Sequence, residues 1–183
     1  MFRLLFAFMI LFGVTAAQAT EAGWALLREG GQIVLMRHAM IGGVTESANF
    51  DISKCATQRN LSERGKQQAR KIGALFAARA APVERVLSSR YCRCLDTARI
   101  AFEAEPEPFE ALDLLKTDEA QRKVQIDAVM TEIRSFSGSD NLVMVTHAEN
   151  IQALAGISPR EGEAVIVRPD GTGLHVLGRI IFN

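Results

Sequence analysis

The chain has no excess of charge of either sign. Its 183 residues carry 21 basic and 21 acidic side chains, for a formal net charge of zero. It therefore has no general attraction for nucleic acid or for anionic lipid, and an anion that it binds must be held by a local site. It also has no internal repeats and no low-complexity linkers. With 48% hydrophobic residues, a chain of this length is expected to form one domain with a proper core.

The sequence also lacks an apolar run of the roughly twenty residues that a membrane-spanning helix needs. Its N-terminal apolar run covers residues 4–14, follows Arg3 and leads to an Ala-x-Ala pattern at residues 17–19. A charged start, a short apolar core and a small-residue exit are typical of a secretory signal peptide. We therefore predict a signal peptide at residues 1–19 and a single exported domain at residues 20–183. This domain would have no membrane span after cleavage and would be secreted into the periplasm; an uncleaved signal anchor is the alternative.

Cysteine and histidine are scarce, with three residues of each. In an oxidising compartment two of the cysteines are expected to form a bridge. Cys92 and Cys94 are separated by one residue, a spacing that strains a mutual disulfide, so we expect Cys55 to pair with one of them. Two alternatives are three buried thiols and a metal site on the Cys-x-Cys pair. With only three histidines as further soft ligands, we predict no metal and no cofactor.

Strands and helices alternate along the rest of the chain. Apolar runs predict strands, and one-sided apolar spacing after capping residues predicts helices. Strands are expected at residues 32–37, 83–88 and 141–146, with a closing hairpin at 164–167 and 174–181; helices are expected at 21–29, 63–80 (capped by Ser62), 95–102 and 118–136 (capped by Thr117). A long polar loop at residues 41–60 and an acidic, proline-rich turn at 103–108 connect them. This alternation predicts an α/β fold, a three-layer α/β/α domain with a mainly parallel sheet.

Basic side chains follow the three predicted parallel strands. Arg37 and His38 follow the first strand, Arg93 follows the second and His147 follows the third. The carboxyl ends of the strands of an open α/β sheet form its ligand crevice, so we expect these residues to meet at one rim. Arginine offers forked donors, and histidine offers a donor or a nucleophilic nitrogen. The rim is therefore suited to a phosphate dianion. We expect the third histidine, His175 on the hairpin, to be structural.

Four segments resemble motifs of the histidine phosphatase superfamily, which includes the phosphoglycerate mutases and the histidine acid phosphatases. Arg37-His38-Ala39 is similar to that family's Arg-His-Gly signature. The run LSERGKQQA at residues 61–69 resembles its Leu-Thr-x-x-Gly-x-x-Gln-Ala helix entry, and SRYCRCLDTA at 89–98 resembles its Ser-x-x-x-Arg-x-x-x-Thr-Ala segment. Val145-Thr146-His147 is similar to the late strand that ends in the second histidine. The motifs occur in the family's order between about residues 32 and 155.

The resemblance implies a phosphoglycerate mutase-like fold and a phosphatase that hydrolyses phosphate monoesters. His38 would attack phosphorus and form a phosphohistidine, while Arg37, Arg93 and His147 would bind the phosphate oxygens. Arg59 is a further candidate for phosphate binding. The substrate would be a small-molecule or glycan phosphate ester. The alternative is a phosphate-recognising binding or regulatory protein of the same fold with little or no turnover.

The chain departs from the family at the acid that protonates the leaving oxygen. Where the acid phosphatase branch has an aspartate after its second histidine, this chain has Ala148. Glu149 is one residue further on, and Glu110 and Asp113 lie in the segment where the mutase-like branch keeps its glutamate. All three are candidate proton donors, and the sequence does not choose between them.

Overall fold

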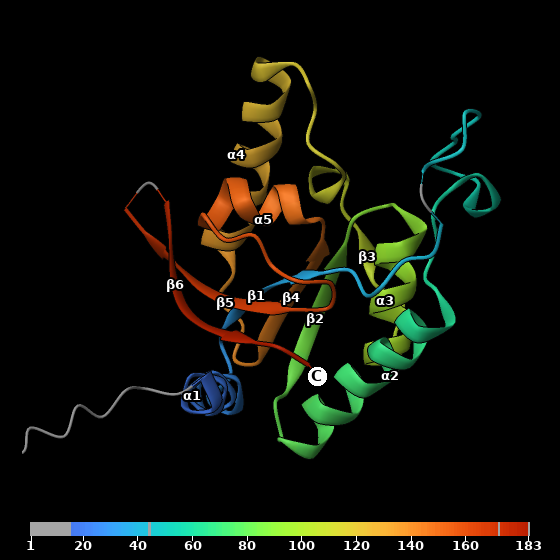
Figure 1. Cartoon of the computed structure of the whole chain (residues 1–183). Helices are drawn as coiled ribbons and strands as arrows, with labels where there is room; N and C mark the ends of the chain where they lie inside the picture. The colour runs from blue at the N-terminus through green and yellow to red at the C-terminus, as the bar shows by residue number, and fades with distance from the viewer. Residues whose placement is uncertain (1–15, 44, 172, 183) are drawn as a thin grey trace, which may run out of the picture.

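A mixed six-stranded sheet with the order β3-β2-β4-β1-β5-β6 forms the centre of the computed structural model (Figure 1). The structure describes residues 16–43, 45–171 and 173–182, so most of the predicted signal peptide lies outside the described residues. Strands β3, β2, β4 and β1 pair in parallel, and the hairpin of β5 and β6 continues the sheet antiparallel to β1. The bounds are β1 Ile33–Arg37, β2 Val83–Ser88, β3 Glu107–Pro108, β4 Asn141–Thr146, β5 Ala164–Asp170 and β6 Gly173–Ile180. The predicted α/β fold with a mostly parallel sheet is confirmed.

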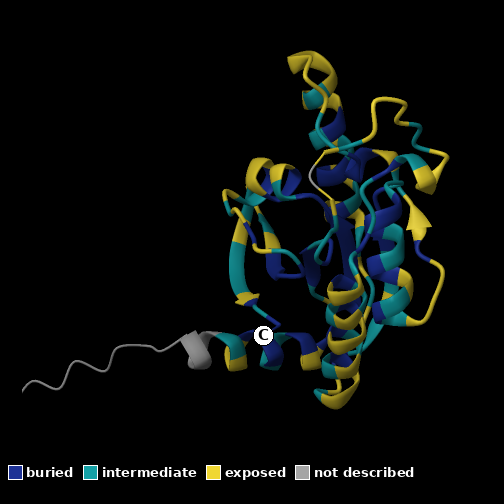
Figure 2. Cartoon of the chain, turned by 45° about the vertical axis from the view of Figure 1, so that its right-hand side comes forward, coloured by how far each residue is buried: buried dark blue, intermediate teal, exposed yellow. Residues whose placement is uncertain are grey.

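Helices cover both faces of the sheet (Figures 1 and 2). Successive β1 side chains point to opposite faces. Val34 and Met36 pack in the cluster that includes α1, α2 and α3, whereas Ile33 and Leu35 pack in the cluster that includes α4 and α5. The bounds are α1 Ala16–Glu29, α2 Glu63–Ala78, α3 Cys92–Phe102, α4 Glu119–Ser135 and α5 Ala148–Ala155. Among the described residues, no helix is long and apolar enough to cross a membrane.

The beginning of α2 is fixed as its sequence predicts, and α2 in turn supports α3. The Ser62 hydroxyl accepts a hydrogen bond from the Gly65 amide at 3.0 Å and caps the helix. Further along, a Cβ added at Gly73 would lie 2.0 Å from the carbonyl oxygen of Ala101 in α3. Only glycine permits this close approach of the two helices. The packing holds α3, the helix that carries Arg93, against the body of the domain.

Several element boundaries differ from the sequence predictions. Helix α3 begins at Cys92 rather than at residue 95, so Arg93 lies in its first turn. Helix α4 is capped by Asp118, whose side chain accepts from the Gln121 amide at 2.9 Å, and not by Thr117. Strand β3 lies inside the predicted acidic turn, where two residues suffice because β2 supplies the pairing. Helix α5 was not predicted from the sequence, since its eight residues are too short to show a clear apolar period.

The long loop at residues 41–60 is tied to the domain at both ends. At its base Ile41 pairs with Leu61 in an isolated bridge. Near its end Cys55 forms a disulfide with Cys92, at a Cα–Cα distance of 5.6 Å, while Cys94 is a buried free thiol. The structure thus chooses Cys92 over Cys94 as the partner. The predicted bridge connects the loop to the first residue of α3, next to Arg93.

The disulfide gives a prediction for thiol counting and for stability. In protein purified without reductant and then unfolded, only Cys94 should react with a thiol reagent, and three thiols should react after reduction. Because the bridge spans 37 residues of sequence, replacing Cys55 and Cys92 by serine should lower the free energy of unfolding by about 3–4 kcal/mol in the chain-entropy description. Urea unfolding measures this loss, with Cys94→Ala as the matched control. Three reactive thiols without reductant would contradict the pairing.

Candidate active site

Three neighbouring strand ends bring the predicted residues together. In the parallel pair of β1 and β4, Arg37 lies opposite Thr146. The next residues are held by backbone hydrogen bonds, because the His38 amide donates to the Thr146 carbonyl at 3.0 Å and the Ser89 amide donates to the Val145 carbonyl at 2.9 Å. The imidazole rings of His38 and His147 are 5.6 Å apart between centroids. The carboxyl ends of β1, β4 and β2 therefore form one rim, as expected from the sequence.

His38 presents an unprotonated nitrogen to this rim. Its Nδ1 lies 2.9 Å from the carbonyl oxygen of Ala39, and because a carbonyl can only accept, Nδ1 carries the proton. The Nε2 atom of the neutral ring is therefore free of hydrogen. Burial and the nearby charges of Arg93, Arg37 and Arg59 lower the pKa of His38 to about 4, against the opposing hydrogen bond to Ala39. The ring is 4% exposed, so its neutral form is maintained over the whole range above pH 5.

A chain of hydrogen bonds sets the tautomer of His147. The Asp113 carboxylate only accepts, so the Ser89 hydroxyl, 2.9 Å away, donates to it. The Ser89 oxygen can then accept from Nε2 of His147 at 3.0 Å, which places the ring proton on Nε2. The other nitrogen, Nδ1, lies 3.5 Å from an Nη2 donor of Arg93. Burial, followed by the charge of Arg93, holds the pKa of His147 well below its usual range.

Arg93 and Arg37 both place a buried nitrogen without an acceptor near the histidines. Arg93 is 4% exposed and lies over the ring of Tyr91, with its guanidinium carbon 4.4 Å from the centroid. Arg37 donates from Nη1 to the Pro159 carbonyl at 3.0 Å. In both side chains the Nε atom is buried without a hydrogen-bond partner among the described residues. Buried donors are rarely left unpaired, so two of them at one rim indicate a site for an anion.

Arg59, the third predicted phosphate-binding arginine, uses two of its donors within its own loop. Its Nη2 donates to the Gly43 carbonyl at 2.8 Å and its Nε to the Gly42 carbonyl at 3.4 Å. The guanidinium therefore holds together the neck of the 41–60 loop. Its charge still lies close enough to His38 to contribute to the lowered pKa of that residue.

The three predicted proton donors lie in different surroundings. Asp113 is 5% exposed and is fixed by Arg90, which contacts it from Nε at 2.8 Å and from Nη2 at 2.7 Å. Glu110 forms an ion pair with the same arginine at 3.0 Å, and Glu149 is exposed in the first turn of α5. Asp113 accepts hydrogen bonds from Ser89 and Arg90, so its geometry fits a positioning role for Ser89 and His147.

Two further residues of the site were missed from the sequence. Ser89 opens the Ser-x-x-x-Arg segment, and that motif could have indicated its role. Glu46 comes from the 41–60 loop, and its carboxylate contacts Nη1 of Arg93 at 2.6 Å. No periodic or motif signal surrounds Glu46, so sequence reasoning could not have found it. The predicted structural residue His175 is exposed on β6.

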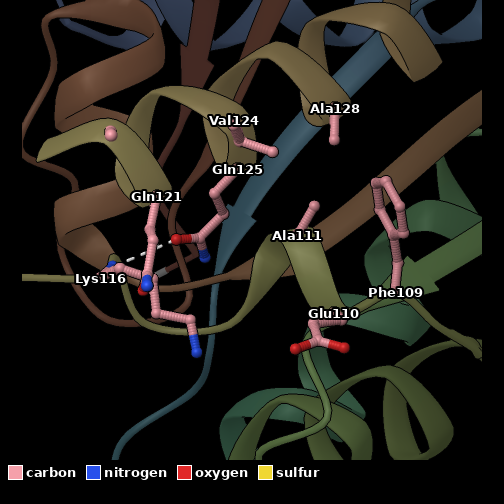
Figure 3. A pocket seen from close by; sticks show the side chains of 9 residues that line it. Phe109, Glu110, Ala111, Lys116, Gln121, Val124, Gln125 and Ala128 are labelled. Atoms are coloured by element: carbon pink, nitrogen blue, oxygen red, sulfur yellow. Dashed lines mark hydrogen bonds between the residues drawn. The ribbon is translucent and has the colours of Figure 1, made fainter. Parts of the chain in front are cut away.

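A separate apolar groove lies between the segment after β3 and helix α4 (Figure 3). It has a volume of about 590 Å³ and is lined by Phe109, Ala111, Val124 and Ala128, among others. Glu110 also lines it, but His38, Arg93 and His147 do not. The groove is therefore distinct from the histidine rim. No group of three metal-ligating side chains occurs in the part of the chain that the structure describes.

Comparison with known proteins agrees with the motifs. Residues 33–119 match the family model of the histidine phosphatase superfamily (branch 1). The resemblance to the histidine phosphatase superfamily is confirmed. The matched region contains Arg37, His38 and Arg93, whereas His147 lies beyond it. No curated protein matches the sequence.

Solved histidine phosphatase structures share the fold at low sequence identity. The protein histidine phosphatase SixA in complex with tungstate is similar with a TM-score of 0.56 and 16% identity, over 81% of this chain and 96% of that one. The α-ribazole phosphatase of Shigella flexneri is similar with a TM-score of 0.61 and 13% identity, over 83% of this chain and 96% of that one. A phosphoserine phosphatase from Entamoeba histolytica is similar with a TM-score of 0.54 and 12% identity, over 81% of this chain and 95% of that one. At these identities the similarity shows the fold alone.

The neutral histidines of this histidine phosphatase fold predict how stability depends on pH. Between pH 7 and pH 5 the unfolded chain takes up protons on His38 and His147 and the folded chain does not, so the free energy of unfolding falls as the pH falls. A shift of the His38 pKa to about 4 corresponds to a loss of roughly 1–2 kcal/mol by pH 5. Urea unfolding at the two pH values measures it. The His38→Gln variant should lose less, and equal losses in both proteins would contradict the assignment.

Proposed function

We propose that this protein is a phosphatase that hydrolyses phosphate monoesters through a phosphohistidine on His38. Phosphatase activity is supported by the match of residues 33–119 to the family model of the histidine phosphatase superfamily. The observation that carries the proposal is an unprotonated Nε2 of His38 beside two buried arginine nitrogens that lack acceptors. A nucleophile next to unpaired cationic donors is the arrangement that attack on a phosphoryl group requires.

In the first step, Nε2 of His38 would bond to phosphorus while the ester oxygen leaves with the electron pair of the broken bond and takes a proton. In the second step, water would attack the phosphohistidine, which releases inorganic phosphate and restores the neutral imidazole. Arg37 and Arg93 would donate to the oxygens of the phosphoryl group in both steps, while His147, whose Nε2 proton is directed at Ser89, would position Nη2 of Arg93. Removing one such donor typically costs 10²–10³ in rate. The hydrogen bond from Nδ1 of His38 to the Ala39 carbonyl supports the ring orientation throughout.

We also propose that the protein is exported as residues 20–183 and acts on a small-molecule or glycan phosphate ester. The charged start and apolar run at the N-terminus support export. The disulfide between Cys55 and Cys92 is compatible with an oxidising compartment.

The proposal predicts the behaviour of His38→Ala. Because the nucleophile is one side chain at a strand end, the variant should fold normally and lose turnover of p-nitrophenyl phosphate. A substrate with a radioactive phosphoryl group should leave acid-labile, base-stable label on the wild type and none on the variant. His175→Ala, which removes an exposed histidine from β6, is the control and should keep both turnover and label.

Normal turnover by His38→Ala would contradict the assignment of His38 as the nucleophile. A wild-type protein that binds inorganic phosphate but turns over no phosphate ester would contradict the proposed activity and favour the phosphate-binding alternative.

A further inference from the structure

The carboxylate of Glu46 joins two of the candidate phosphate ligands. Its Oε1 contacts Nη1 of Arg93 at 2.6 Å, and its Oε2 accepts from the backbone amide of Arg59 at 2.7 Å. The Glu46 side chain is 32% exposed, whereas the Arg93 side chain is 5% exposed. Glu46 therefore covers the arginine from the solvent side. Its carboxylate lies on one donor of the guanidinium whose other donor faces His147.

The 41–60 loop is held where it can keep Glu46 at this position. The disulfide fixes Cys55 to the first residue of α3, one position before Arg93. Phe50 stacks on Tyr91 with centroids 5.3 Å apart, and the ring of Tyr91 contacts His147 edge-on at 4.9 Å. The disulfide and the stacking of Phe50 on Tyr91 therefore tie the loop to the rim. Glu46 is part of the site and not a distant loop residue.

A phosphoryl group that binds Arg93 would meet the carboxylate there. Arg93 is buried and cannot move away, so a phosphate oxygen would take the place of Oε1 on the guanidinium. Oε2 could keep its hydrogen bond to the Arg59 amide, which leaves Oε1 beside the phosphoryl group. A carboxylate without its cationic partner and next to a dianion favours the protonated form, because two like charges repel at short range. Substrate binding would thus change Glu46 from an ion-pair partner into a carboxylic acid next to the reacting atoms.

We propose that Glu46 is the general acid of the reaction, a role that rests on the proposed phosphatase activity. As the bond between phosphorus and the ester oxygen breaks and the bond to Nε2 of His38 forms, the leaving oxygen takes the Glu46 proton and departs as the alcohol. The Glu46 carboxylate then accepts a proton from the water that attacks phosphorus. This step breaks the bond to nitrogen and releases phosphate. The proton that Glu46 first carries enters with the substrate monoanion.

Other carboxylates fit this role less well. The oxygens of Asp113 are occupied by contacts with Arg90 and Ser89, and Glu110 pairs with the same Arg90. Glu161 contacts Nη2 of Arg37, but at the longer distance of 3.9 Å. Its carboxylate also faces the Ile41 amide at 3.4 Å. Of the carboxylates in the described residues, Glu46 makes the shortest contact with a candidate phosphate arginine.

The test compares two substrates that differ in how much they need an acid. The leaving oxygen of p-nitrophenyl phosphate is a weak base, whereas that of an alkyl phosphate is a strong base. General acid catalysis typically contributes 10²–10⁴ in rate. Glu46→Gln should therefore lower kcat for the alkyl phosphate about 100-fold or more and change kcat for p-nitrophenyl phosphate less than about tenfold. Glu46→Asp should restore part of the lost alkyl phosphatase activity. Glu119→Gln, an exposed glutamate at the start of α4, is the isosteric control and should leave both rates unchanged.

Each other outcome overturns the proposal. If Glu46→Gln lowers both rates equally, Glu46 only supports the loop. If it raises both rates, the carboxylate is an inhibitor that competes with phosphate. If Glu161→Gln, and not Glu46→Gln, shows the dependence on the leaving group, the acid is Glu161. In these three cases the wild type still turns over substrate, so the phosphatase proposal stands. A wild type without turnover of either ester would overturn both proposals together.

Discussion

The buried positive charge of Arg93 is the constraint on which the rest of the rim depends. An arginine with 4% of its surface exposed carries a charge that is costly to desolvate, and it is tolerated only where partners face its donors. Glu46 contacts Nη1, His147 lies beside Nη2, and the face of the guanidinium lies over Tyr91. The Nε atom keeps no partner among the described residues. The loop, the disulfide and the second histidine can all be understood as means of keeping this charge in place and available to an anion.

Burial, together with this charge, lowers the pKa of both histidines and so keeps them neutral. Neutrality has a different consequence for each ring. At His38 the Ala39 carbonyl accepts a hydrogen bond from Nδ1–H, which leaves Nε2 as a nucleophile. At His147 the Ser89 oxygen, whose own proton is donated to Asp113, accepts a hydrogen bond from Nε2–H, and the remaining nitrogen faces Arg93. The two histidines thus differ in tautomer because Nδ1 of His38 meets the Ala39 carbonyl, whereas Nε2 of His147 meets the Ser89 hydroxyl.

The layout of the fold could be predicted from the sequence because the strands of the sheet are apolar and short. The bounds predicted for β1, β2 and β4 agree with the structure to within one residue. The positions of Arg37, His38 and His147 at the strand ends could therefore be predicted as well. Contacts that depend on irregular chain could not be predicted. Glu46 reaches Arg93 across 47 residues of sequence, from a loop without periodicity. Helix α5 and strand β3 are too short to be recognised without the neighbours that stabilise them. The choice of Cys92 over Cys94 depends on where α3 begins, since the helix turns the second thiol into the core.

A crystal structure of the protein with orthovanadate tests the central claim most directly, because this ion takes the geometry of a phosphoryl group during transfer. We expect vanadium to lie within bonding distance of Nε2 of His38. Arg37 and Arg93 should donate to its oxygens beside His147, and the carboxylate of Glu46 should be displaced from Nη1 of Arg93. Vanadate bound away from the two histidines, with Glu46 still on Arg93, would contradict it.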